Sequence, residues 1–475
     1  MVPDQLPRPS HEELAALVVS LRAELVETRA ELVRARAQIT ELQARLGSHS
    51  GNSDRPPSSD GLAKPAPKPR SLRGKTGRKP GGQPGHAGET LQQVATPHHR
   101  RVHQPQQCAG CGRDLAGRPV TDGVARQCFD LPAVEVEVTE HVLQERECVC
   151  GHRTRADAPE GIDAPVQYGP RITAVVIYLY VGQFLSKSRT AQALAELFGT
   201  PMSGGTVAAL TGRAAGRLDG FAEMVRQKLT GSQVVGFDET GLRVAGNLHW
   251  VHCARTDRYT LITCHPKRGK AGIDDLGVLT GFAGVAVHDA WAPYDSYTAA
   301  QHQLCCAHLL RELQAVTDTT GQPWAAKAAK AIVAMQKLVT DAITAGHDLL
   351  EETALQRHIR RYREAAVAGI NHTNARTSKL MKTHNALAFR LLERQRDYLR
   401  FTSDWRVPPD NNGSERDIRM IKLRQKVSGC LRTLVGAQQF CVIRSYLSTA
   451  AKHGVHALDA LIMLAQGTPW IPDAT

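Results

Sequence analysis

Three acidic residues far apart in the sequence each adjoin a segment with a strong secondary-structure signal. Asp238 and Asp289 each close a short β-branched run, and Glu415 lies in Asn-Asn-Gly-Ser-Glu-Arg at the expected start of a helix. One sheet edge can therefore gather all three, and hard cations such as Mg²⁺ (or Mn²⁺) bind carboxylate oxygens. Two such ions activate a water or a 3′-hydroxyl in phosphodiester chemistry and remove the repulsion between the carboxylates. The simpler alternative for Glu415 is helix capping together with Asn412.

The sequence around these acids predicts a mixed α/β sheet. We expect strands at 233–244, 248–255, 259–265 and 284–288, and helices at 273–279 and 308–316. Three strands, a crossover and a neighbouring fourth strand suit a ribonuclease-H-like core, with Asp238 on the first strand and Asp289 at the end of the fourth. An all-α insertion is expected to interrupt this core before Glu415. Its first helix has an apolar face formed by Trp324, Ala328, Ile332, Met335, Val339 and Ile343.

The first segment of the chain has heptad periodicity between Leu14 and Leu46. One ladder contains Leu14, Leu21, Thr28, Ala35 and Leu42, and the other contains Val18, Leu25, Leu32, Ile39 and Leu46. Nearly five a/d repeats predict a coiled coil through which the chain self-associates. The alternative is a single amphipathic helix folded back on the body of the protein.

The next segment is rich in Gly, Pro and Ser, and between Gly61 and Gly88 it contains seven Lys and Arg residues and no acid. Such a composition cannot bury a core, so we expect a mobile cationic tether. Its basic residues are expected to contact DNA phosphates, in particular Arg73, Lys75, Arg78 and Lys79. The alternative is a linker whose charge only aids solubility.

Two cysteine pairs follow, Cys108-x2-Cys111 and Cys148-x-Cys150, with an alternating strand-like run at 133–143 between them. Four thiolates in a tetrahedron suit Zn²⁺, which predicts a zinc-ribbon-like module. The second pair is tighter than the common Cys-x2-Cys, so His152 or His141 is an alternative ligand. The other interpretation is a set of buried cysteines without a metal, which we expect of Cys128.

Two further segments suggest contact with DNA. Residues 189–197 and 203–218 resemble a helix-turn-helix with Ser203 as a cap, although ordinary helix packing is equally compatible with them. After Glu415 comes a basic run, opposed only by Asp417, that is expected either to bind phosphates or to form a solvated face. The candidates for phosphate contact are Arg416, Arg419, Lys422 and Arg424.

Charge and cysteine content limit the class of protein. The chain has 59 Lys and Arg against 46 Asp and Glu and a pI near 9.3, which favours nucleic acid as a partner. No apolar run is long enough to span a membrane, and the first residues lack signal-peptide features. The eleven cysteines show no disulfide framework, so a cytoplasmic, reducing location is expected.

These motifs together resemble those of transposases of the insertion sequence 66 family. The resemblance rests on residues 52–60 and 77–86, the cysteine pairs, Asp238-Glu-Thr-Gly, His308-Leu-Leu-Arg-Glu-Leu and Asn411-Asn-Gly-Ser-Glu-Arg. It implies a DDE transposase, a magnesium-dependent polynucleotidyl transferase in which Asp238, Asp289 and Glu415 bind the metal. Cys305-x2-His308 further resembles a signature that supports the core of many such enzymes; the alternative is a buried cysteine beside a helix-start histidine.

The resemblance also implies partners and a reaction. The expected reaction is cleavage and strand transfer at the terminal inverted repeats of an insertion sequence, with double-stranded target DNA and accessory transposition proteins as further partners. The alternatives are a domesticated DNA-binding protein that has lost catalysis and a resolving or repair nuclease. The predicted organisation is a coiled coil at 11–46, a linker at 47–91, a zinc-ribbon-like module at 92–165, a helical DNA-binding region at 166–230, the core at 231–317 and 406–467, and the insertion at 318–405.

Overall fold

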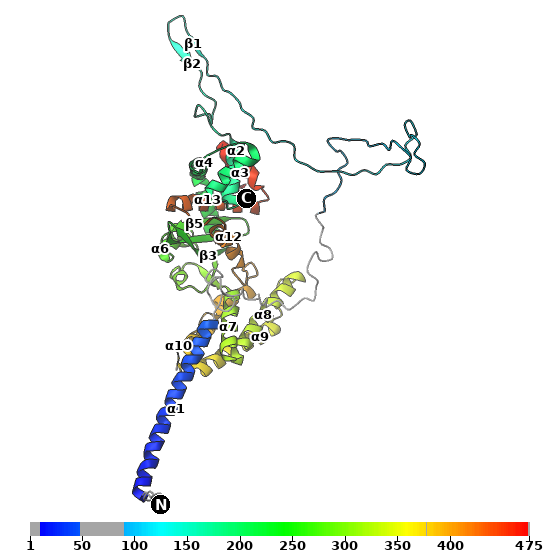
Figure 1. Ribbon diagram of the computed structural model, residues 1–475. Coiled ribbons are helices and arrows are strands. Elements are labelled where there is room, and N and C mark those ends of the chain that lie inside the picture. Colours follow the sequence, from blue (N-terminus) through cyan, green and yellow to red (C-terminus); the bar gives the residue numbers. More distant parts are fainter. Residues whose placement is uncertain (1–9, 48–89, 377, 474–475) are drawn as a thin grey trace, which may run out of the picture.

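The computed structural model describes residues 10–47, 90–376 and 378–473. A mixed α/β body carries a long helix on one side and an extended irregular arm on the other (Figure 1). The four basic residues predicted to contact DNA from the tether lie outside the described residues, namely Arg73, Lys75, Arg78 and Lys79. No helix in the described ranges is long and apolar enough to cross a membrane.

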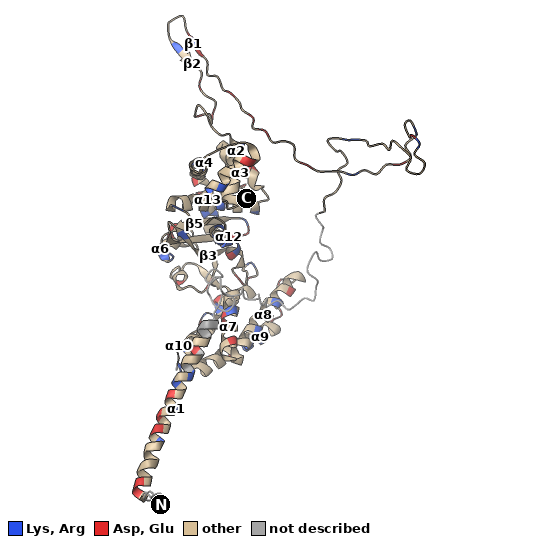
Figure 2. Ribbon diagram, viewed as in Figure 1, with Lys and Arg blue, Asp and Glu red and all other residues tan. Residues whose placement is uncertain are grey.

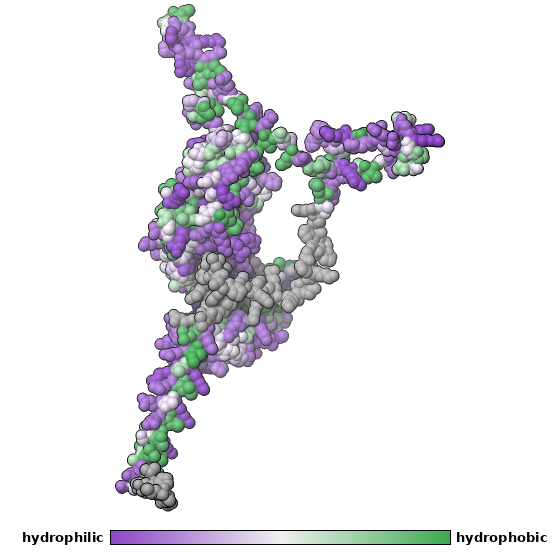
Figure 3. Space-filling model, viewed as in Figure 1, coloured by the Kyte–Doolittle hydropathy of each residue, from purple (hydrophilic) through white to green (hydrophobic). Residues whose placement is uncertain are grey.

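Helix α1 (His11–Gly47) projects away from the body (Figure 1). A reciprocal cap starts it: the Ser10 hydroxyl accepts from the Glu13 N–H at 3.2 Å, and the Ser10 N–H donates to the Glu13 carboxylate at 2.7 Å. Apolar and polar residues are interleaved along its surface (Figure 3), and charges of both signs alternate along it (Figure 2). The heptad leucines are about half exposed, for example Leu21 at 53% and Leu32 at 50%. The predicted helix is therefore present, and it does not fold back along the body.

The arm, residues 90–165, is mostly irregular. Its only strands in the described part are β1 (Glu145–Glu147) and β2 (Arg153–Arg155), which pair antiparallel. The strand expected at 133–143 is wrong, because that run has extended backbone with no hydrogen-bonded neighbour and its side chains are exposed. Alternation in sequence produces a strand only where a second strand and a core face are present.

A helical unit precedes the sheet. It contains α2 (Pro170–Ile177), the π-helical turn η2 (Tyr178–Gly182), α3 (Lys187–Phe198), α4 (Gly204–Gly216) and α5 (Asp219–Thr230). Ser186 and Ser203 cap α3 and α4 by accepting backbone N–H groups, and Gly199 ends α3 in the left-handed conformation. The two helices of the predicted helix-turn-helix are present. Helix α4 packs on α2, α3 and α13.

The sheet has the strand order β5-β4-β3-β6-β7. Strands β3 (Val234–Val244), β4 (Asn247–Arg255) and β5 (Thr260–His265) form an antiparallel meander. Strands β6 (Val285–His288) and β7 (Gln301–Leu304) continue from β3 in parallel. The four expected strands and the β3–β6 neighbourhood are confirmed. Strand β7 was not predicted, because Gln-His-Gln-Leu is short and largely polar.

Helices cover the sheet and close one of its edges. Helix α6 (Lys270–Leu276), the short turns η3 (Leu279–Gly281) and η4 (Ala292–Ser296), α12 (Asn412–Ser428) and α13 (Leu434–Lys452) surround the strands, and α14 (Ala457–Gln466) packs on α2. On the edge strand β5, the N–H groups of Thr260 and Ile262 donate to the hydroxyls of Thr449 and Ser445 at 3.1 and 2.8 Å. These side chains of α13 satisfy donors that would otherwise recruit another strand.

The helical insertion has its own core. It contains α7 (Cys306–Thr320), α8 (Pro323–Thr344), α9 (Glu352–Thr373), α10 (Lys379–Glu393), α11 (Gln395–Leu399) and the turn η5 (Arg400–Thr402). Trp324, Ile332 and Met335 are buried there as their periodicity predicted, together with Tyr362. Ile343 is 51% exposed, because it lies in the last turn of α8 beyond the reach of that core.

Candidate active site

Strand β3 and helix α12 approach each other unusually closely beside Asp238. A β-carbon on Gly236 would overlap the Ser414 hydroxyl and lie 3.0 Å from Asn411 Oδ1. Gly236 and Asp238 are two positions apart on one strand, so both face α12. The glycine therefore allows the helix that carries Glu415 to lie directly on the strand that carries Asp238.

Asn411 joins three elements at this point. Its side-chain amide donates to Phe237 O on β3 at 2.6 Å, and its backbone N–H donates to the Cys305 sulfur at 3.2 Å. The Ser414 hydroxyl donates to Asn411 Oδ1 at 2.7 Å, inside the first turn of α12. All these atoms are buried, so the start of α12 is fixed relative to β3 and to the first residues of α7.

Asp417, one turn beyond, fixes the same helix to the sheet. Its carboxylate lies 3.2 Å from Arg255 Nε of β4 and 2.8 Å from Lys452 Nζ of α13. The Thr260 hydroxyl donates to the same oxygen at 3.1 Å. The single acid in the predicted basic run is therefore an internal anchor of α12.

Asp289 follows β6, which runs parallel to β3 with Gly236 opposite Val287. Asp238 and Asp289 each lie two residues beyond this pair, so the parallel register brings the two acids next to each other, although β3 itself continues to Val244. The Trp291 N–H donates to Asp289 Oδ1 at 3.0 Å and holds the carboxylate at the start of the loop. This edge is the one that the sequence predicted.

The electrostatics indicate mutual repulsion among the acids. Burial, then the charges of Glu239, Glu415 and Asp289, raise the pKa of Asp238 well above its ordinary value. Burial and then the charge of Glu239 raise the pKa of Asp289 to about 6, although His308 and Arg268 act in the opposite direction. The charges of Glu415 and Asp289 therefore act on Asp238, in a setting that disfavours the ionised forms of Asp238 and Asp289 without a cation.

Glu415 is turned towards α7. Its Oε1 lies 3.3 Å from Arg311 Nη2 and 3.7 Å from His308 Nε2. Within residues 10–47, 90–376 and 378–473, no three Asp, Glu, His or Cys side chains are arranged to hold a metal ion. Asp238 and Asp289 therefore offer carboxylate oxygens beside each other, while Glu415 is held aside by Arg311 and His308.

Cys305 and His308 occupy supporting positions around Glu415. The Cys305 sulfur accepts the Asn411 N–H, and burial raises the pKa of its thiol to about 12. His308, one turn into α7, contacts the Glu415 carboxylate. Neither residue resembles a nucleophile; the pair connects the start of α7 with the start of α12.

Glu239 is a site residue that the sequence reasoning missed. Its side chain is 1% exposed, is paired with Arg268 Nη2 at 2.7 Å and accepts from the Tyr294 hydroxyl at 2.6 Å. The Arg268 guanidinium stacks over Trp291, 4.0 Å from the ring centre. Glu239 therefore holds the loop after Asp289 from the opposite face of β3. The adjacent Asp-Glu pair was the available signal, since neighbouring strand residues face opposite sides.

Most of the body of this chain matches the model of a known protein family. A family model described as Transposase IS66 family matches residues 165–439. The chain belongs to the IS66 transposase family. A second model, of a family of unknown function (DUF6444), matches residues 2–92. No curated protein matches the chain.

The basic residues on α12 of this transposase differ in how exposed they are. Arg416 and Arg419 are exposed on α12, beside the acidic edge. Lys422 donates to Gly241 O at 2.7 Å, and Arg424, only 4% exposed, donates to Gly429 O at 3.2 Å and lies over the Tyr180 ring. The surface position expected of Arg424 is therefore wrong, because the end of α12 packs against η2.

The cysteine pairs of the transposase form two separate turns. Cys108 donates its N–H to Arg113 O at 2.9 Å, and Cys148 donates to His152 O at 2.8 Å. Backbone N–H groups lower the pKa of both Cys108 and Cys148, which favours thiolates. The described structure does not gather the four sulfurs, and Cys128, expected to be buried, is exposed.

Proposed function

We propose that this transposase cleaves DNA at the terminal inverted repeats of its insertion sequence and joins the ends to target DNA. The observation that supports this most strongly is that the charges of Glu415, from the first turn of α12, and of Asp289, directly after β6, both act on Asp238 of β3. The strand order, with three antiparallel strands followed by two parallel ones, supports a ribonuclease-H-like core for this chemistry. We assign the catalytic role to these three carboxylates.

The proposed cofactor is Mg²⁺ (or Mn²⁺), held by Asp238, Asp289 and Glu415. Such ions, when bound, activate the attacking oxygen and stabilise the leaving one. The acids supply hard oxygen donors, and burial followed by neighbouring negative charge raises the pKa values of Asp238 and Asp289, which a cation would offset. To join its partners, Glu415 exchanges its contacts with Arg311 and His308 for the cation.

Other residues of the chain position the DNA. Arg416 and Arg419 lie one turn or less from Glu415 and are exposed, so they are suited to contact phosphates next to the scissile bond. The exposed heptad face of α1 supports pairing with a second copy, which would present two DNA ends together. Zn²⁺ is proposed to join the turns of Cys108 and Cys111 with those of Cys148 and Cys150, because both turns favour thiolates.

The test is cleavage and strand transfer of duplexes that carry the element ends, in Mg²⁺. Asp289→Asn is expected to lower the rate at least about 10³-fold, because it removes a charge on which the reaction depends. Asp257→Asn is the matched control, since that side chain is 96% exposed in the turn after β4. Sequence-specific binding with no cleavage by the wild type would overturn the catalytic proposal in favour of a binding-only protein.

A further inference from the structure

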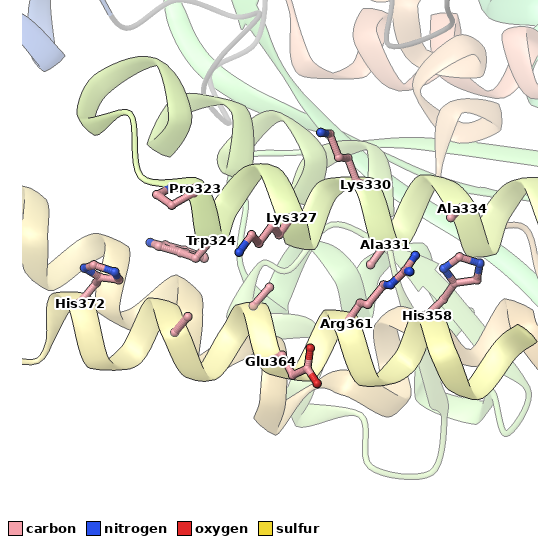
Figure 4. A pocket seen from close by; sticks show the side chains of 12 residues that line it. Pro323, Trp324, Lys327, Lys330, Ala331, Ala334, His358, Arg361, Glu364 and His372 are labelled. Atoms are coloured by element: carbon pink, nitrogen blue, oxygen red, sulfur yellow. The ribbon is translucent and has the colours of Figure 1, made fainter.

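A groove of about 470 Å³ lies between α8 and α9 of the helical insertion (Figure 4). Its floor consists of small side chains, because alanines line both helices where they face each other: Ala331, Ala334, Ala365 and Ala368. Gly369 permits this close packing, since a β-carbon there would lie 2.8 Å from the Trp324 ring. Long side chains on the rims therefore enclose a shallow channel.

The rims carry an excess of positive charge. Lys327 and Lys330 project from α8 and Arg361 from α9, while Glu364 is the one acid among the lining residues (Figure 4). In the described structure, none of the three cations forms an ion pair with a carboxylate. Lys337, farther along α8 and outside the groove, is paired with Asp341. The cations of the groove therefore have no carboxylate partner among the described residues, whereas Lys337 on the same helix has one.

The environment of His358 on α9 reflects the same excess of positive charge. Burial, then the charges of Arg361 and Arg357, lower its pKa, so the imidazole is neutral near pH 7. Its Nδ1 is buried without a hydrogen-bond partner in the described residues. Positive charge that no carboxylate offsets favours an anionic ligand in this groove.

The dimensions and the lining identify the ligand class. His358 and His372 mark its two ends on α9 and are about 21 Å apart at 1.5 Å per residue, the length of about six phosphates on one strand of B-DNA. Trp324 is 1% exposed and its ring N–H donates to Gln322 at 2.6 Å, so it offers no face for stacking a base. This excludes the aromatic platform that single strands use.

We propose that the α8–α9 groove binds the phosphate backbone of duplex DNA without reading its sequence. The inference rests on the proposed function and adds a second contact region to it. Helix α7 connects the two regions: His308 near its start contacts Glu415, and its other end leads into α8. From His308 to Thr320 the helix rises about 18 Å. The groove would hold DNA about half a helical turn away from the acidic edge.

The experiment compares two triple variants of the full-length protein. Lys327→Ala, Lys330→Ala and Arg361→Ala together empty the groove of its cations. Lys337→Ala, Lys379→Ala and Lys382→Ala remove the same charge from exposed positions of the same insertion. Affinity for a random-sequence duplex, and for a single strand of the same length, is measured by fluorescence anisotropy from about 50 to 200 mM salt. Thermal unfolding verifies that both variants are folded.

The groove variant is expected to bind about 10- to 100-fold more weakly at low salt, with a log-log salt slope smaller by about 2 to 3, near 0.9 for each phosphate that the protein no longer neutralises. The control is expected to change the slope by less than about 1. Equal salt slopes for the two variants, together with cleavage by the wild type, would contradict the proposed DNA contact in the groove. The proposed function would not be affected by that result. A weakening confined to single strands would overturn the duplex assignment, and wild-type protein that binds no duplex would overturn both proposals.

Discussion

The Glu415 carboxylate and the Arg311 guanidinium form an ion pair of 3.3 Å that crosses from α12 to α7. Both side chains are more than a quarter exposed, so the pair contributes about 1 kcal/mol at most. A contact of this strength is readily exchanged. Arg311 is thus the partner of the Glu415 carboxylate in the structure. A divalent cation at the proposed site has to compete with Arg311 for this carboxylate.

Arg311→Gln is therefore expected to tighten the binding of Mn²⁺, about threefold to tenfold, because a competing positive charge is removed. Titration calorimetry without DNA measures this directly. Arg360→Gln, an exposed position on α9, is the control for a general change in net charge. Weaker binding in Arg311→Gln would mean that the arginine positions Glu415 for the cation instead of competing with it.

The raised pKa of Asp289 leads us to expect that the stability of the metal-free protein, measured with a chelator present, depends on pH. Its folded pKa of about 6 is above the ordinary value of 3.8, so the folded protein binds more protons than the unfolded chain between these values. Stability is thus expected to fall as pH rises from about 4 through 6, by on the order of 3 kcal/mol. Thermal melts at closely spaced pH values measure the effect. Asp289→Asn should flatten this part of the profile, and an unchanged profile would contradict the assignment.

Gly236→Ala tests the contact between β3 and α12. The added methyl group overlaps the Ser414 hydroxyl, so α12 must shift and Glu415 moves with it. We expect a decrease of about 1 to 3 kcal/mol in unfolding free energy and a reduced cleavage rate. Gly220→Ala, in the first turn of α5 with open space around it, should cost nothing. Addition of Ser414→Ala to Gly236→Ala should restore part of both the stability and the rate.

Cys305→Ala tests the sulfur that accepts the Asn411 N–H. A buried donor left without a partner costs about 1 to 3 kcal/mol, and chemical denaturation measures that cost. Cys305→Ser keeps an acceptor and should be less destabilising. The native thiol, with a pKa near 12, should resist alkylation at pH 8, whereas exposed Cys430 reacts. Rapid alkylation of Cys305 in folded protein would contradict its position in the structure.

The sheet and its acidic edge were largely predictable from sequence because their signals are local. Short β-branched runs ended by turn residues placed β3, β4, β5 and β6, and the acids that come directly after such runs marked Asp238, which lies within β3, and Asp289, which follows β6. Strand β7 lacked that signal, since its burial is imposed by β6 and η5 rather than by its own polar residues. The role of Glu239 was equally hidden, because it depends on Arg268 and Tyr294 from later parts of the chain.

Exposure was the harder property to predict. Arg424 reads as a member of a basic run, but its position one turn before the end of α12 directs it under η2. Conversely, the alternation at 133–143 indicated a half-buried strand, and no neighbouring element among the described residues buries it. Both errors arise because the elements that pack against a residue decide whether it is buried. Local sequence periodicity predicts burial only for segments that lie in a continuous core.

Helices α12 and α13, late in the sequence, supply side chains that earlier elements of the sheet need. Strand β5 depends on Ser445 and Thr449 for its outer donors, and the acidic edge acquires Glu415 only after the entire insertion. A ribosome-bound or prematurely terminated chain therefore presents an uncapped strand and lacks the third of the three acidic residues. Completion of the C-terminal part covers this strand edge, so an incomplete chain is prone to aggregate until α13 has been made.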